Sequence, residues 1–137
     1  MNDKLNKCCD RLTEEVRVTE AHLAQVGEHL ASAVDKESDA LEACQQHALA
    51  KCEAKREQAE QAGERIKQFI EETANTAVSK FENWKTDREI AKLERHADKA
   101  EDHAVDAIVV AAYAILEAEA AIVEALKSRK VAIEVAG

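Results

Sequence analysis

The sequence contains no proline and only three glycines, Gly27, Gly63 and Gly137. Mixed and all-β folds need tight turns, and those turns usually use glycine, proline or Asn-Gly steps. Because these residues are scarce, the expected fold class is all-α. A chain of 137 residues has the usual length of one domain, so a single all-α domain over residues 1–137 is expected.

Aromatic and positively charged surfaces are also lacking. Aromatic residues make up 3% of the chain, the net charge is −9, and each third of the sequence is net acidic. Nucleic-acid binding needs clustered Lys and Arg, and single-strand binding adds aromatic stacking platforms, so nucleic acid is not an expected partner. Anionic membrane surfaces are disfavoured for the same electrostatic reason.

Long apolar runs are absent as well. The most apolar run covers ten residues, 107–116, whereas a membrane-spanning helix needs about 20. No transmembrane segment is therefore expected. The first residues also lack the charged and apolar regions of a signal peptide, which predicts a cytoplasmic protein whose four cysteines are reduced.

Large apolar side chains are few. Leu, Ile, Val and Phe total 29 of 137 residues, about 21%, which is close to the level typical of disordered chains. Helical periodicity argues against disorder, so the core must be thin. Long, slender helices that share surface with a partner fit this composition better than a thick globule.

Alanine, in contrast, recurs regularly in the last third of the chain. Two ladders with a seven-residue spacing together form one a/d seam of a helix, where leucine or isoleucine is usual. A seam of alanine is useful only where another helix backbone comes very close. The first ladder is Ala97, Ala104, Ala111, Ala118, Ala125 and Ala132, and the second is Ala100, Ala107, Ala114 and Ala121.

Three helices are predicted, over about 3–33, 38–84 and 87–135. The polar stretch 35–39 is the first candidate break, with Ser38 as the N-cap of the second helix, although an uninterrupted helix through 35–39 is the alternative. Thr86 and Glu89 form a capping box that predicts the start of the third helix. The apolar face of 38–84 fits an eleven-residue repeat about as well as a seven-residue one, which predicts a nearly straight helix.

The second and third helices have similar predicted lengths and a very short connection, which is typical of an antiparallel hairpin. Folding the chain about residue 85 or 86 places Ala111 near Glu60. The second helix offers small residues, Cys52, Ala59 and Ala62, along the facing stretch. The sequence thus predicts an elongated antiparallel helical bundle or coiled coil, in which an alanine-rich, close-packed hairpin is joined by an N-terminal helix.

One apolar set remains without a partner in this hairpin. Ile108, Ile115 and Ile122 form a ladder of their own beside the alanines, so the third helix is apolar around more than half of its circumference. The N-terminal helix can cover only part of this surface. A second copy of the chain is expected to cover the rest, as a homodimer or higher oligomer with two-fold symmetry as the simplest form; another helical protein is a possible further partner.

The best candidate for a metal or thiol site is the cluster of Cys44, His47 and Cys52, which share one helix face. One helix supplies at most two or three of the four ligands that a tetrahedral zinc site needs. The simpler interpretation is that both cysteines are small buried hydrophobes, a common role of the free thiol. No metal or cofactor is therefore expected, and these three residues stay weak candidates for a metal- or thiol-based sensor.

Two further sets of residues are candidates for chemistry. Cys8 and Cys9 lie near a helix N-terminus, where the pKa of a thiol can fall, so either one is a candidate reactive thiol or intersubunit link. Histidines form two seven-spaced pairs beside the apolar faces, a pattern also found at half-solvated surface positions. These pairs are His22 with His29 and His96 with His103.

No catalytic motif is present. The Glu-x-x-His pairs of di-iron bundles, nucleophile elbows and phosphate-binding glycine loops are all missing. The expected function is therefore a non-enzymatic scaffold or adaptor built as a homo-oligomeric helical bundle. The alternatives are the metal- or thiol-responsive sensor and an amphipathic protein that coats a granule or lipid surface.

Overall fold

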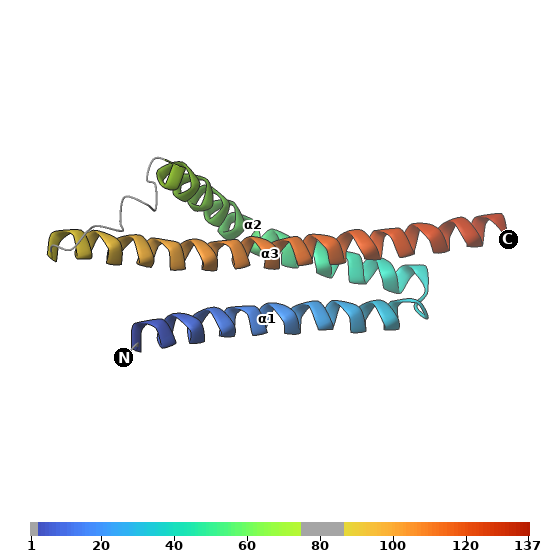
Figure 1. Ribbon diagram of the computed structural model, residues 1–137. Helices are drawn as coiled ribbons and strands as arrows, with labels where there is room; N and C mark the ends of the chain where they lie inside the picture. The colour runs from blue at the N-terminus through green and yellow to red at the C-terminus, as the bar shows by residue number, and fades with distance from the viewer. Residues whose placement is uncertain (1–2, 75–86) are drawn as a thin grey trace.

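The computed structural model describes residues 3–74 and 87–137. It contains the helices α1 (Asp3–Ala33), α2 (Ser38–Ala74) and α3 (Asp87–Ala136). α1 and α3 run in the same direction along an elongated molecule, and α2 runs the opposite way (Figure 1). The predicted all-α class and the hairpin of the second and third helices are confirmed.

The predicted break between the first two helices is present. The amide of Lys36 donates to the carbonyl of Ala33 at 3.1 Å where α1 ends, and the Leu41 amide donates to the Glu37 carbonyl at 3.0 Å where α2 begins. Glu37 thus supplies the first carbonyl of α2, one residue earlier than predicted. The hydroxyl of Ser38, the expected cap, donates to the Glu134 carboxylate at 3.3 Å.

The second predicted boundary falls only partly on described residues. α2 is described as far as Ala74, and its expected continuation to residue 84 lies outside the described residues, as does the predicted cap Thr86. α3 begins at Asp87, so Glu89 lies in its first turn, as the capping-box pattern predicts. The third helix is present from the first residue described after the gap, and both its exact start and the capping contact stay predictions.

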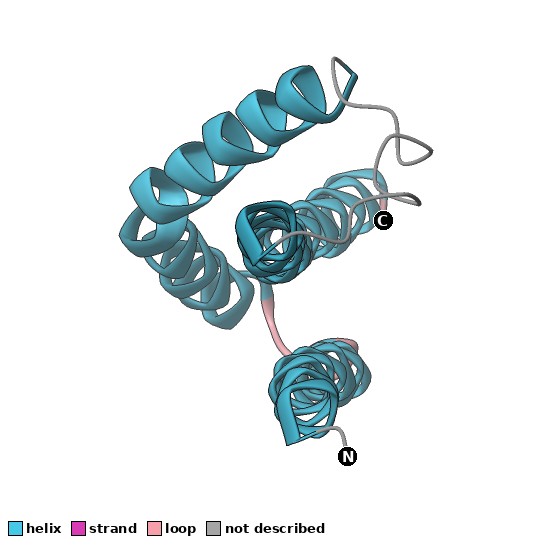
Figure 2. Ribbon diagram, turned by 60° about the vertical axis from the view of Figure 1, so that its left-hand side comes forward, coloured by secondary structure: helices cyan, strands magenta, loops and turns pink. Residues whose placement is uncertain are grey.

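α3 is the central element of the molecule. α1 and α2 each pack chiefly against α3, which lies between them in the view of Figure 2. The ion pairs Arg65–Asp106 and Lys99–Glu72 join residues that are symmetric about position 85–86. The predicted register of the hairpin is therefore confirmed. Along the other side of α3, Lys4 pairs with Glu94, which sets a parallel register for α1.

α2 is not the nearly straight helix that its repeat predicts. It changes direction along its length and wraps over α3 (Figures 1 and 2). Contacts in its second half explain this course, because Arg65 binds Asp106 and Phe69 stacks on His103 with ring centroids 4.4 Å apart. A long helix curves around the surface on which it packs.

Small residues form the inward stripe of α2, as predicted. Cys52 is 5% exposed, and it packs with Leu116 and Ala120 of α3, beside the half-buried Tyr113. Small side chains on α2 thus face a mixture of large and small ones on α3. The buried apolar residues of α2 are Leu41, Ala48, Cys52, Ala59 and Ala62.

The alanine ladders do not face α2, and this part of the prediction is wrong. Ala111 and Ala118 are exposed, whereas Leu116, Ala120 and Val123 form the buried stripe of α3. The buried stripe carries larger apolar side chains, which remove more surface from water, and it turns the alanines outward. We call the outward residues the alanine face: Ala97, Ala100, Ala104, Ala107, Ala111, Ala114, Ala118, Ala121 and Ala125, of which Ala100 and Ala104 are half-buried.

α1 contributes little to the core. Only Val26 and Ala33 of this helix are buried, both in its second half. Leu5 and Leu23 are 63% and 57% exposed, so part of the apolar surface of α1 remains outside the fold.

The chain exposes 9749 Å² of surface. A compact monomer of 15.1 kDa exposes roughly 7,100 Å². A larger area is expected of an elongated arrangement of helices (Figure 1). Within residues 3–74 and 87–137, no helix combines the length and apolar character that spanning a bilayer requires.

Candidate functional site

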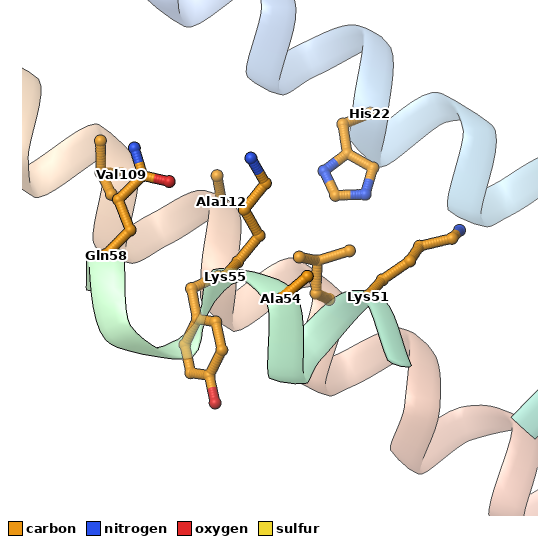
Figure 3. A pocket seen from close by; sticks show the side chains of 9 residues that line it. His22, Lys51, Ala54, Lys55, Gln58, Val109 and Ala112 are labelled. Atoms are coloured by element: carbon orange, nitrogen blue, oxygen red, sulfur yellow. The ribbon is translucent and has the colours of Figure 1, made fainter. Parts of the chain in front are cut away.

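A groove lies between α1 and α2, because both helices dock on α3 and leave space between them. The groove contains a cavity of about 380 Å³ (Figure 3), which we call the central cavity. Its apolar lining comes mainly from α3, while α1 and α2 supply polar side chains at its edge. The lining residues are His22, Lys51, Ala54, Lys55, Gln58, Val109, Ala112, Tyr113 and Leu116.

The ionisable groups at the edge of the central cavity are His22, Lys51 and Lys55 (Figure 3). Lys51 also approaches the buried carboxylate of Glu119, with 3.5 Å between Nζ and Oε1. In the part of the chain that the structure describes, neither Lys55 nor His22 has a hydrogen-bond or ion-pair partner. The cavity therefore combines an apolar floor with unpaired nitrogen donors.

A second, more polar cavity of about 230 Å³ lies where the three helices meet, and we call it the junction cavity. Glu119 of α3 is 7% exposed and lies between two donors, with His29 Nδ1 at 3.4 Å and Lys51 Nζ at 3.5 Å. The Lys36 ammonium donates to Cys44 Sγ at 3.3 Å. The lining is His29, Ala33, Lys36, Cys44, His47, Glu119 and Val123.

The predicted cluster of Cys44, His47 and Cys52 is only partly brought together. Cys44 and His47 line the junction cavity, whereas Cys52 is buried in the apolar core beside Leu116. Burial raises the pKa of the Cys52 thiol, followed in effect by the charge of Glu117. Among the described residues, no three His, Cys, Asp or Glu side chains lie close enough together to hold a metal ion.

Lys36 and Glu119 were not predicted as site residues, and His29 was predicted only in a pair with His22, because the residues of the junction cavity lie on separate segments of the chain. The pairing register about 85–86 was the signal available, since it places Glu119 opposite the stretch of α2 that contains Cys52. Finding His29 also required the parallel register of α1 on α3, for which the sequence offers no turn geometry.

The N-terminal cysteines differ from the prediction at one position. Cys8 faces α3, and a hydrogen bond to Glu101, helped by burial, raises the pKa of its thiol. A raised pKa opposes thiolate formation, so the expected activation by the helix N-terminus does not apply to Cys8. Cys9 is exposed, and its Sγ lies 3.9 Å from the Thr13 hydroxyl.

The histidine pairs take separate places. His22 and His29 line the two neighbouring cavities of the groove. His96 and His103 flank Phe69 of α2, at centroid distances of 6.3 and 4.4 Å. The Nδ1 atom of His103 is buried without a hydrogen-bond partner among the described residues. His29, His96 and His103 thus contact a neighbouring helix, whereas His22 lines a cavity without a partner among the described residues.

One strong polar contact was not predicted. Asp106 is 8% exposed and accepts hydrogen bonds from Arg65 Nε and Nη2, the shortest at 2.8 Å. This paired geometry joins α2 to α3 through two parallel hydrogen bonds from one guanidinium.

Comparisons of the chain with known protein families, characterised proteins and solved structures find no match. The site must therefore be interpreted from its own residues. The described cavities hold ammonium, imidazole and thiol groups against an apolar floor, an arrangement suited to binding.

Proposed function

We propose that this protein is a non-enzymatic helical scaffold or adaptor that assembles with a second copy of itself through the alanine face of α3. The observation that carries the proposal is the exposure of this face. Seven of its nine alanines are exposed along a helix of 50 residues. Near the start of the face, Ala97 and Ala100 border a groove against α1, so the open part of the face runs from Ala107 to Ala125.

The chemistry of the face supports self-association. From Ala97 to Ala125 its side chains are methyl groups, and the half-buried residues Ile108, Ile115 and Ile122 border it. A continuous apolar surface of this kind is unusual on a soluble monomer and marks interaction sites. Because alanine side chains are short, two such helices can bring their backbones closer than leucine seams allow.

The symmetry of such a face supports a second copy as the occupant. A two-fold axis places the alanine face of one chain against the alanine face of the other, so short side chains meet short side chains along both helices.

Light scattering after size-exclusion chromatography tests this proposal. The expected mass is about twice the chain mass of 15.1 kDa at micromolar concentration. A single species at the chain mass over the whole concentration range contradicts self-association.

Paired variants locate the surface. Ala111→Glu puts a carboxylate at the middle of the alanine face, and burying an unpaired charge is strongly unfavourable, so it should yield monomers. Ala50→Glu is the matched control, because Ala50 is an exposed alanine of α2 outside that face. Equal dissociation by both variants, or by neither, contradicts this choice of surface.

A specific contact supports a second candidate function, a thiol-responsive interaction protein centred on Cys44. The ammonium of Lys36 donates to Cys44 Sγ at 3.3 Å, so a cation lies beside the sulfur that would react with oxidants and electrophiles. The test is the rate of alkylation of Cys44 in Lys36→Met, compared with the native chain. Loss of Lys36 should slow the reaction several-fold, and an unchanged rate removes this candidate.

A further inference from the structure

The central cavity has a distinct chemistry that self-association does not use. Its volume of about 380 Å³ falls within the range of roughly 300–1,000 Å³ found for small-molecule pockets. Val109, Ala112 and Leu116 of α3 form an apolar floor, and α1 and α2 form the two sides. Such a site accepts an apolar body and positions it with a few polar groups at the edge.

The charge at the edge of the cavity determines which polar group a ligand should carry. Acidic residues outnumber Lys and Arg by 28 to 19 in the chain, yet none of the nine described residues that line the cavity is Asp or Glu. Its three ionisable nitrogen groups are His22, Lys51 and Lys55, and Lys55 has no partner among the described residues. In Figure 3 the side chains of His22 and Lys55 reach into the space between the helices, whereas Lys51 extends away from them.

We infer that the central cavity binds a small amphipathic anion, an apolar chain or ring that ends in a carboxylate, sulfonate or phosphate. The apolar body lies against Val109, Ala112 and Leu116. The anionic group receives hydrogen bonds from Lys55 and His22. Lys51 adds a positive charge that Glu119 partly neutralises.

Binding of decanoate tests the inference, measured by isothermal titration calorimetry below its micelle concentration. Saturable binding with one decanoate for each chain is expected. Decanol has the same chain without the charge. Its affinity should be at least about tenfold lower, since a hydrogen bond to a charged group contributes about that factor. Equal affinity for decanoate and decanol overturns the assignment of the anionic group.

Three variants separate the two parts of the site. Lys55→Glu should weaken decanoate binding at least about tenfold, whereas Lys67→Glu, the same charge change at an exposed residue of α2 outside the cavity, should leave it unchanged. Ala112→Phe fills the floor and should abolish binding of decanoate and decanol alike. Circular dichroism confirms that each variant is helical. Decanoate binding that survives both Lys55→Glu and Ala112→Phe contradicts this location.

Ligand binding in the central cavity should not depend on the oligomeric state. No residue of the alanine face lines the central cavity, so monomeric Ala111→Glu should bind decanoate as the native chain does. If decanoate instead binds only to monomers and dissociates the native assembly, the groove is occupied by a second copy and the small-ligand site is wrong.

Discussion

Leu41 is the one large side chain that is fully buried among the described residues. It lies in the first turn of α2, where α2 meets the end of α3. When so few large side chains are buried, the stability of the fold depends strongly on each of them, because little other apolar surface is removed from water.

Replacement of Leu41 therefore gives the sharpest stability prediction. Leu41→Ala should lower the free energy of unfolding by about 2–5 kcal/mol through lost burial and a cavity. Leu49→Ala is the matched control on the same helix, because Leu49 is 46% exposed, and it should cost less than about 1 kcal/mol. Urea unfolding followed by circular dichroism measures both, and equal losses would contradict the packing of α2.

The buried thiol of Cys52 predicts a dependence of stability on pH. Burial raises the pKa of Cys52 in the folded chain, so the unfolded chain ionises first as the pH rises. The stability that this residue contributes is intact below the ordinary thiol pKa and is lost as the pH rises from there through the higher pKa of the folded chain.

This loss is isolated by comparison with Cys52→Ala, which has no thiol to titrate. Between pH 7 and about pH 9.5, the unfolding free energy of the native chain should fall relative to that of Cys52→Ala. A difference that stays constant over this range shows that Cys52 titrates alike in both states.

At the scale of the helices, α1 is the least well anchored element. Both of its buried residues, Val26 and Ala33, lie in its second half. Around Leu5 and Cys8 its contacts with α3 are ion pairs such as Lys4–Glu94 and Arg11–Asp102, which are exposed and contribute little. The helix is thus held more firmly at its C-terminal end.

Hydrogen exchange should follow this asymmetry. Backbone amides in residues 5–18 should exchange faster than those in residues 24–33, because local opening of the first half exposes almost no buried apolar surface. Mass spectrometry of peptides from the exchanged protein measures this. Equal protection in the two halves of α1 would show that its N-terminal half is held by contacts outside the single chain.

The helices and the hairpin register were predictable, but the rotation of α3 was not. Periodicity and the scarcity of glycine and proline locate helices, and the short connection about position 85–86 sets the pairing of α2 with α3. A seven-residue period, however, is carried on α3 by the alanines, by Ile108, Ile115 and Ile122, and by Leu116 with Val123. Spacing alone does not show which of these stripes is buried. Side-chain size places the alanines outside, but Ile108, Ile115 and Ile122 are as large as Leu116 and Val123 and are only half-buried.

The candidate site was predictable to a similar, limited degree. Cys44 and His47 share a face of one helix, so their neighbourhood follows from local geometry. His29 and Glu119 reach the same place from α1 and α3, which requires knowing the packing of three helices. The central cavity arises because α1 and α2 do not fill the angle between them, and no local pattern of residues encodes that space.

At the scale of the whole molecule, self-association predicts that stability depends on protein concentration. Each tenfold rise in concentration should stabilise a dimer by about 1.4 kcal/mol and raise the melting temperature by a few degrees. Ala111→Glu should melt at a temperature independent of concentration. A native chain that also shows no concentration dependence contradicts the dimer.

The central position of α3 also has a consequence for biosynthesis. α1 and α2 pack chiefly against α3, which is the last of the three helices to leave the ribosome. At about 5–20 residues per second, several seconds pass between the synthesis of α1 and that of the helix on which it docks. Isolated helices are marginally stable in water, so α1 and α2 should stay unfolded or fluctuating until α3 has been synthesised.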